Sequence, residues 1–245
     1  MLGENMKVIY SLITILLLFG CNEKSIAQSV FNMPIEKIFT REDSLKLAEA
    51  VKEKRHDEIK KLLTSEVDIN AQGKGGFTVL MVAMLKDDID TFSLLLESGA
   101  NPNLLLENGS SVMYQSVIYG DSKFLKKALM FKGNPNIYNS ETKKYALHEA
   151  VAPQKLEYVK LLVESGADMN VVDGVNSTPL LTAGSLDQYD IAYHLLLNGA
   201  DYKIGNRWNK TIVDRINESF LDHQAEQYQY LLKSKQLLIR DGVDF

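Results

Sequence analysis

The sequence predicts an all-α fold, a solenoid of about six stacked repeats that include degenerate caps at both ends. The first observation is a polar segment, preceded by glycine in most copies, that returns every 33 or 34 residues at Asp68, Asn101, Asn134, Asp168 and Asp201. The second is a segment that opens each following unit at the same spacing. Its copies are Thr78-Val79-Leu80-Met81, Ser111-Val112-Met113-Tyr114, Tyr145-Ala146-Leu147-His148, Thr178-Pro179-Leu180-Leu181 and Thr211-Ile212-Val213-Asp214. Two motifs that share one period indicate a single array.

Each unit is predicted to hold a turn, two short antiparallel helices and an extended finger, because apolar residues recur at helical spacing after both motifs. The unit that opens at Thr178 shows this most clearly. Thr178 can cap the first helix, and Pro179 suits the first helical position, where its missing N–H does no harm. The second helix stops at Gly199, which can take a left-handed conformation. The same role is predicted for Gly99, Gly133 and Gly166.

These motifs resemble those of the ankyrin repeat, which reads T-P-L-H and then, about twenty residues later, G-A-D-x-N. The resemblance covers residues 43–245, which we assign as the repeat domain. Around Leu45 to Asn70 we expect a capping repeat, because terminal repeats need a polar outer face. That charged face comprises Lys52, Glu53, Lys54, Arg55, Asp57, Glu58, Lys60 and Lys61. After Thr211 the second helix is predicted to be lengthened, which indicates an atypical C-terminal cap.

Residues 1–21 are predicted to form a lipoprotein signal peptide, and residues 22–42 a tether. Met6-Lys7 precedes an almost wholly apolar stretch from Val8 to Phe19, the pattern of a secretory signal and too short to span a bilayer comfortably. Leu18-Phe19-Gly20-Cys21 resembles the lipobox of bacterial lipoproteins, whose cysteine is acylated. Cys21 is the single cysteine of the chain, so it is the predicted lipidation site.

Met6 is the better working start, since the residues before it would add Glu4 to the positively charged region. Asn22 follows the cysteine where lipoproteins retained in the inner membrane carry Asp, so the outer membrane is favoured. We therefore expect a lipid-anchored domain in the periplasm. Met33 is a candidate internal start that would give a cytosolic form.

Composition and motifs argue against several function classes. The net charge of −5 provides no basic surface for nucleic acid. The four histidines do not pair at metal-ligand spacing, and we find no nucleophile elbow or phosphate-binding loop. His148 stands at the His position of the ankyrin motif, where a structural role is expected. We therefore predict a non-enzyme with no metal, no cofactor and no small-molecule substrate.

The predicted partner-binding surface consists of the finger tips and the exposed side of each first helix. Large apolar groups there, with arginine nearby, are typical interface anchors. The predicted partner-binding residues are Lys74, Phe77, Leu85, Lys86, Glu107, Asn108, Ile118, Tyr119, Glu141, Lys144, Val175, Leu186, Arg207, Trp208 and Lys210.

An acidic ankyrin array behind a lipoprotein signal resembles the immunity proteins of type VI secretion phospholipase effectors. This resemblance implies that the chain binds a cognate phospholipase effector and neutralises it by occlusion. Two alternatives stay open: a cell-envelope scaffold that binds a resident periplasmic partner, and an accessory subunit that protects a periplasmic oxidoreductase. The neighbouring gene would separate the three.

Overall fold

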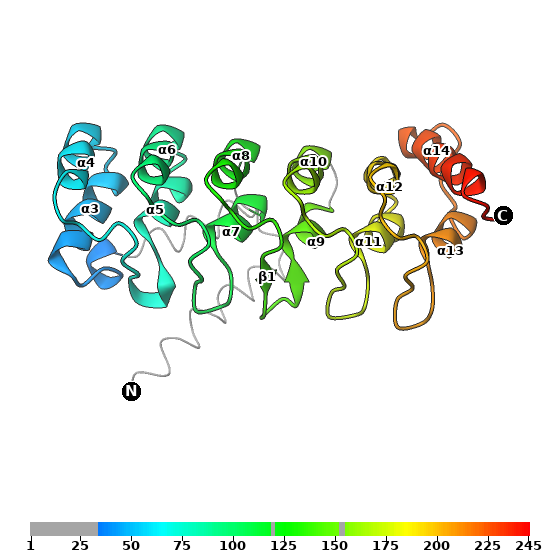
Figure 1. The fold of residues 1–245 in the computed structure, drawn as a ribbon, viewed down its shortest axis with the longest axis horizontal. Helices are drawn as coiled ribbons and strands as arrows, with labels where there is room; N and C mark the ends of the chain where they lie inside the picture. Colours follow the sequence, from blue (N-terminus) through cyan, green and yellow to red (C-terminus); the bar gives the residue numbers. More distant parts are fainter. Residues whose placement is uncertain (1–33, 119–120, 152–154) are drawn as a thin grey trace. The chain divides into compact units, whose positions relative to one another are not determined.

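The computed structural model describes residues 34–118, 121–151 and 155–245. The chain divides into two compact units, residues 1–100 and 101–245, which we describe separately. Both units consist of helix pairs joined by projecting loops, which confirms the predicted all-α repeat solenoid (Figure 1). Cys21, Met6 and Met33 lie outside the described residues, as does Tyr119.

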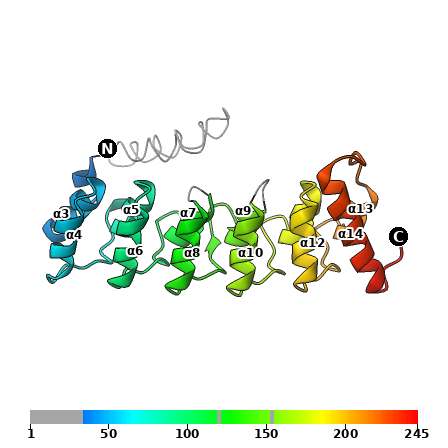
Figure 2. The same ribbon diagram turned by 90° about the horizontal axis from the view of Figure 1, so that it is seen from above.

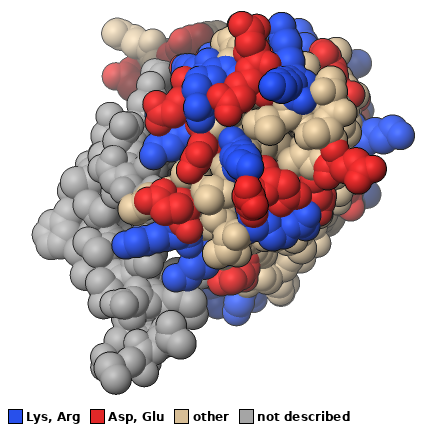
Figure 3. All heavy atoms as spheres, turned by 90° about the vertical axis from the view of Figure 1, so that its left-hand side faces the viewer, with Lys and Arg blue, Asp and Glu red and all other residues tan. Residues whose placement is uncertain are grey.

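The first unit holds two helix pairs. Its elements are η1 (Ile35–Lys37), α3 (Glu42–Lys52), α4 (His56–Leu63), η2 (Lys74–Gly76), α5 (Val79–Leu85) and α6 (Ile89–Glu97). Leu47, Val51 and Ile59 of the first pair are fully buried, as is Phe92 of the second. Lysines, arginines and acidic residues alternate over the end formed by α3 and α4, as a capping repeat requires (Figure 3).

The second unit continues the same pattern. Its elements are α7 (Val112–Ile118), α8 (Ser122–Met130), β1 (Tyr138–Asn139), β2 (Lys144–Tyr145), α9 (Ala146–Ala150), α10 (Leu156–Glu164), α11 (Pro179–Ser185), α12 (Tyr189–Leu197), α13 (Ile212–Asn217) and α14 (Glu226–Arg240). Within this unit α7, α9, α11 and α13 form one row, from which the fingers project, and the second helices form another (Figures 1 and 2). The antiparallel pair β1–β2 makes one finger, with Tyr138 opposite Tyr145.

Side-chain amides explain why the polar motif recurs. The Oδ1 atoms of Asn103, Asn136 and Asn170 accept hydrogen bonds from the backbone N–H groups of Asn134, Asp168 and Asp201, at 2.7, 2.7 and 2.9 Å. Each bond joins one repeat to the next within the second unit. It also satisfies a backbone donor that the loop would otherwise leave unpaired. The motif thus has a structural role, which explains its recurrence.

The predicted helix ends are confirmed with one correction. Thr178 Oγ1 accepts from the N–H of Leu181 at 3.2 Å, and Pro179 opens α11. Gly99, Gly166 and Gly199 have φ of 96°, 88° and 89°, as left-handed helix caps do.

Gly133 does not have this role. The residue that takes the positive φ after α8 is Lys132, at 63°. Gly133 instead aligns with Ala100 and the other alanines of the Gly-Ala-Asp motif, at a tightly packed position. A Cβ atom there would lie 2.7 Å from the carbonyl oxygen of Ala128. The glycine is required for space, and its own φ is not positive.

The predicted lengthening of the last helix is confirmed, because α14 has 15 residues and α12 has 9. Its residues Leu231 and Leu238 are buried. None of the described helices is both long enough and apolar enough to cross a bilayer.

Candidate functional site

Three fingers of the second unit contain turns organised by one polar side chain each. Asn139 Oδ1 accepts from the N–H groups of Glu141 and Thr142 at 2.9 and 3.0 Å. The Oδ1 atoms of Asp173 and Asn206 accept equivalent hydrogen bonds from backbone N–H groups of the turns that follow them. Both residues, like Asn139, stand five positions after the polar motif residue of their own repeat. Such side-chain turns fix the loop backbone. The backbone of these three fingers is therefore ordered by the chain itself.

Exposed apolar side chains occupy equivalent positions on these fingers. Leu105, Tyr138 and Val172 each stand four residues after the polar motif residue of their repeat, and all three are exposed. Val175 and Trp208 each stand seven residues after it, and Trp208 is 66% exposed. We call these five residues the finger row. Because exposed apolar side chains recur at fixed positions on these fingers, they are the candidate interaction residues of the second unit.

Two aromatic members of the finger row are supported by neighbours. The Tyr138 ring centroid lies 4.9 Å from that of Tyr145 on the paired strand. The guanidinium carbon of Arg207 lies 4.6 Å from the centroid of the Trp208 ring, a cation–π contact. Aromatic side chains restrained in this way lose little conformational entropy on binding, which suits them to anchor a protein partner.

The structure divides the predicted binding residues of the second unit into two groups. Glu107, Glu141, Val175, Leu186, Arg207 and Trp208 are exposed. Asn108, Ile118, Lys144 and Lys210 are half-buried. Lys210 Nζ lies 2.6 Å from Glu218 Oε1, and Lys144 Nζ lies 3.6 Å from Glu149 Oε1. These lysines are engaged within the fold, so they are less available to a partner than the exposed group.

In the first unit, Lys74 is exposed, whereas Phe77, Leu85 and Lys86 are half-buried. The Phe77 ring packs beside Gly75, where a Cβ atom would lie 3.4 Å from it. The aromatic anchor expected at Phe77 is thus partly covered by its own finger.

Sequence reasoning missed Leu105, Tyr138 and Val172. They could have been found from the sequence because each is apolar and stands four residues after the polar motif residue. The helical core does not use that position.

His148 is held structurally, as its place in the motif predicts. Its Nε2 lies 2.8 Å from the carbonyl oxygen of Ser177 in the next finger, so Nε2 donates. The side chain is buried, and this burial lowers the pKa of His148 below its ordinary 6.5. Its Nδ1 atom has no hydrogen-bond partner among the described residues.

We expect this histidine to make the second unit acid-sensitive. Its pKa is lower when folded than when unfolded, so its contribution to stability is present above about pH 6.5 and is lost as the pH falls through the folded pKa. Urea unfolding at pH 7.5 and 5.5 should show a larger loss of stability for the wild type than for His148→Gln, which keeps a donor for Ser177. Equal losses in the two proteins would contradict this assignment.

Among the described residues, no group of three or more His, Cys, Asp or Glu side chains could hold a metal ion. The surface that the fingers present is instead apolar and aromatic, with charged side chains between its members. Such an arrangement can bind another protein by shape and by desolvation.

Comparison with known proteins identifies the family to which the chain belongs. A family model of three ankyrin repeats matches residues 112–206, and a model of a single ankyrin repeat matches residues 75–108, together slightly more than half of the chain. An ankyrin repeat domain of Acinetobacter baumannii has a similar structure, with a TM-score of 0.68 and 25% identity over 80% of this chain and 97% of that one. The chain therefore belongs to the ankyrin-repeat proteins.

Curated relatives match over shorter stretches. The mouse protein phosphatase 1 regulatory subunit 27 is 44% identical over 77 residues, which are 31% of this chain. Protein PhlB of Serratia liquefaciens is 27% identical over 120 residues, 49% of this chain. The chain spans 50% and 53% of the lengths of these two relatives. Ankyrin repeats indicate protein–protein interaction, and the fold is typical of non-catalytic scaffolds.

Proposed function

We propose that this chain is a lipid-anchored immunity protein that faces the periplasm and neutralises a cognate antibacterial effector. The proposed effector is a type VI secretion phospholipase, and the proposed mode of inhibition is occlusion. The observation that carries the proposal is the finger row, exposed apolar side chains that recur at fixed positions on the fingers. No chemistry by this chain is required.

The chemistry of the finger row suits such a partner. An enzyme that takes lipid from a membrane must present apolar surface around its substrate entrance, because the acyl chains have to leave the bilayer without crossing water. An apolar row of matching shape can cover that surface and gain the free energy of its burial. Arg207, exposed beside Trp208, adds a charged contact at the edge. Binding there would exclude the lipid substrate directly.

Two further observations support the proposal. The mouse relative is named as the regulatory subunit of an enzyme, and inhibition by a bound ankyrin array is regulation of the same general kind. The lipobox-like sequence that ends at Cys21 would place the chain at the membrane that such an effector attacks. The outer membrane is the proposed site, with a shorter cytosolic form starting at Met33.

Membrane attachment should depend on one thiol. Cys21→Ser is expected to abolish acylation and to leave precursor or soluble protein, because the acyl chains are the proposed anchor. Ile35, Ile38 and Phe39, at the end of the predicted tether, are buried in the fold instead. Palmitate labelling and membrane fractionation check this, with Ser25→Ala in the tether as the matched control. Labelling that persists in Cys21→Ser would refute the lipid anchor.

The neighbouring gene provides the first test of the proposed function. A phospholipase with features of secretion cargo beside this gene is the expected finding, whereas a metabolic enzyme or an envelope machine would favour the accessory or scaffold alternatives. The decisive experiment directs that neighbour to the periplasm of a bacterial host. Co-expression of the full chain should restore growth, and continued killing in the presence of the chain would overturn the proposal.

A further inference from the structure

The connection between α13 and α14 is longer than its counterparts. Eight residues, Glu218 to Ala225, separate α13 from α14, whereas three separate α11 from α12. Phe220 stands in this extended loop and is fully exposed, at 101% of its reference area. A phenylalanine left wholly in water forgoes about 2 kcal/mol of burial free energy, and no packing role in the repeat explains it.

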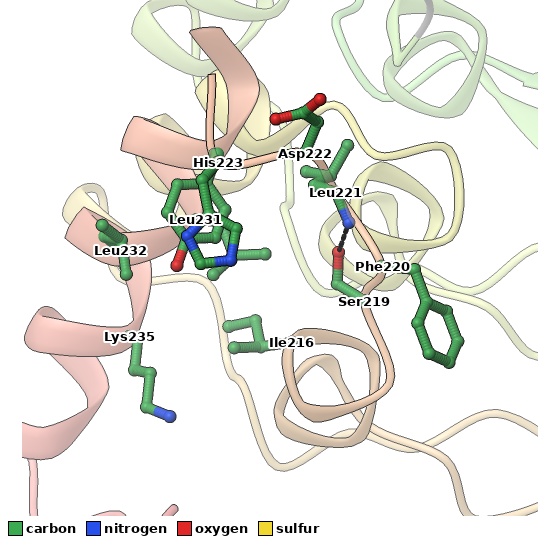
Figure 4. Close-up of a pocket in the computed structure, with 10 residues that line it drawn as sticks. Ile216, Ser219, Phe220, Leu221, Asp222, His223, Leu231, Leu232 and Lys235 are labelled. Carbon is green, nitrogen blue, oxygen red and sulfur yellow. Dashed lines mark hydrogen bonds between the residues drawn. The ribbon is translucent and has the colours of Figure 1, made fainter. Parts of the chain in front are cut away.

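A hollow lies directly beside this loop. Its volume is about 660 Å³, and Ile216, Leu221, Leu231 and Leu232 provide apolar wall. Ile216 and Leu231 are themselves buried, so they form its floor. Figure 4 shows these side chains gathered on one side of the loop, with the Phe220 ring directed away from them. The loop thus carries an apolar projection next to a recess whose wall is partly apolar and partly polar.

Two charges of opposite sign line the hollow. Asp222 stands on the loop, two residues after Phe220, and Lys235 stands on α14. Neither side chain has an ion-pair partner in the part of the chain that the structure describes. Lys235 Nζ lies instead 4.5 Å from the centroid of the Phe245 ring. A body that presents a phenylalanine together with one charge of each sign can therefore cover the apolar wall and pair with both Asp222 and Lys235.

This chain is itself such a body. We propose that the α13–α14 loop is a self-association surface, on which the Phe220 of each copy enters the hollow of the other and Asp222 of each copy pairs with Lys235 of the other. In a two-fold interface the same patch of each copy faces the other, so the projection and the recess must both lie on that patch. The surface comprises few residues, so the dimer is weak, at the small end of specific interfaces. It leaves the finger row free for a different partner.

The test uses two differently tagged copies of the full chain, co-expressed, solubilised in detergent and purified through one tag. Recovery of the second tag measures self-association. Phe220→Ala in both copies should lower that recovery by at least about tenfold. Met130→Ala removes another exposed apolar side chain, 67% exposed on α8, and should leave recovery unchanged.

Charge exchange makes the test specific. Asp222→Lys in both copies, or Lys235→Asp in both copies, places like charges together and should also lower recovery. One copy with Asp222→Lys combined with one copy with Lys235→Asp should restore it, since both pairs then have opposite charges. A shared detergent micelle cannot produce this pattern, because every variant keeps the same N-terminal segment.

Unchanged recovery with Phe220→Ala, or no restoration in the mixed pair, would overturn the proposal. All substituted side chains lie at the surface, so melting temperatures within about 2 °C of the wild type confirm that folding is intact. The result does not depend on the immunity function, because no effector is present.

Discussion

Tyr114→Ala is expected to lower the free energy of unfolding of the second unit by about 3–5 kcal/mol. Tyr114 is fully buried at 0% exposure, on α7 at the motif position that His148 occupies in the next repeat. Its hydroxyl lies 2.9 Å from Thr142 Oγ1 and 2.9 Å from Glu149 Oε1, both in that next repeat. Truncation would leave a cavity and also remove the hydrogen bond that the hydroxyl donates to the Glu149 carboxylate.

Urea unfolding followed by circular dichroism measures this effect. Tyr114→Phe separates its two parts, because it keeps the ring and removes only the hydroxyl. It should cost about 1–3 kcal/mol, the range for a hydrogen bond to a charged group. If Tyr114→Ala cost no more than Tyr114→Phe, ring packing between the repeats would contribute nothing, which contradicts the fold described above.

The double variant Tyr138→Ala, Trp208→Ala is expected to weaken binding to the partner about 1,000-fold. Each truncation at an interface anchor costs about 2 kcal/mol, and side chains on separate fingers add nearly independently. A total of about 4 kcal/mol corresponds to three orders of magnitude in Kd. Thermal stability should change little, because both side chains are exposed.

Isothermal titration against the neighbouring gene's product measures this loss. Met130→Ala is the matched control, an equally exposed apolar truncation outside the fingers. Normal affinity in the double variant would show that the partner uses another surface. An equal loss in the control would point instead to a general effect of exposed apolar residues.

Much of the fold could be predicted from the sequence because its determinants are local. The cap at Thr178, the proline at position 179 and the left-handed glycines act within one turn of chain, so the repeat period reveals them. Gly133 was assigned wrongly because glycine has two uses, conformational freedom and small size. Only the packing against Ala128 shows that size is the one required here.

The binding surface was harder to predict because exposure depends on neighbouring fingers. Phe77 was expected to project, and it is half-buried beside its own glycine turn. Tyr138 was not among the predicted residues because the sequence does not show whether an apolar finger residue packs or projects. The extended α13–α14 loop delays the apolar residues of the last helix, so the sequence indicated only a lengthened helix there. It did not reveal that Phe220 points into water.

Occlusion by the finger row can be tested on lipid hydrolysis by the neighbouring phospholipase, measured on phospholipid vesicles with increasing amounts of the full chain. We expect hydrolysis to stop at a one-to-one ratio with the wild type and with Met130→Ala. The variant Tyr138→Ala, Trp208→Ala should need a far higher concentration. Undiminished hydrolysis at saturating wild-type chain, or equal inhibition by the double variant, would contradict the claim that the finger row occludes the enzyme.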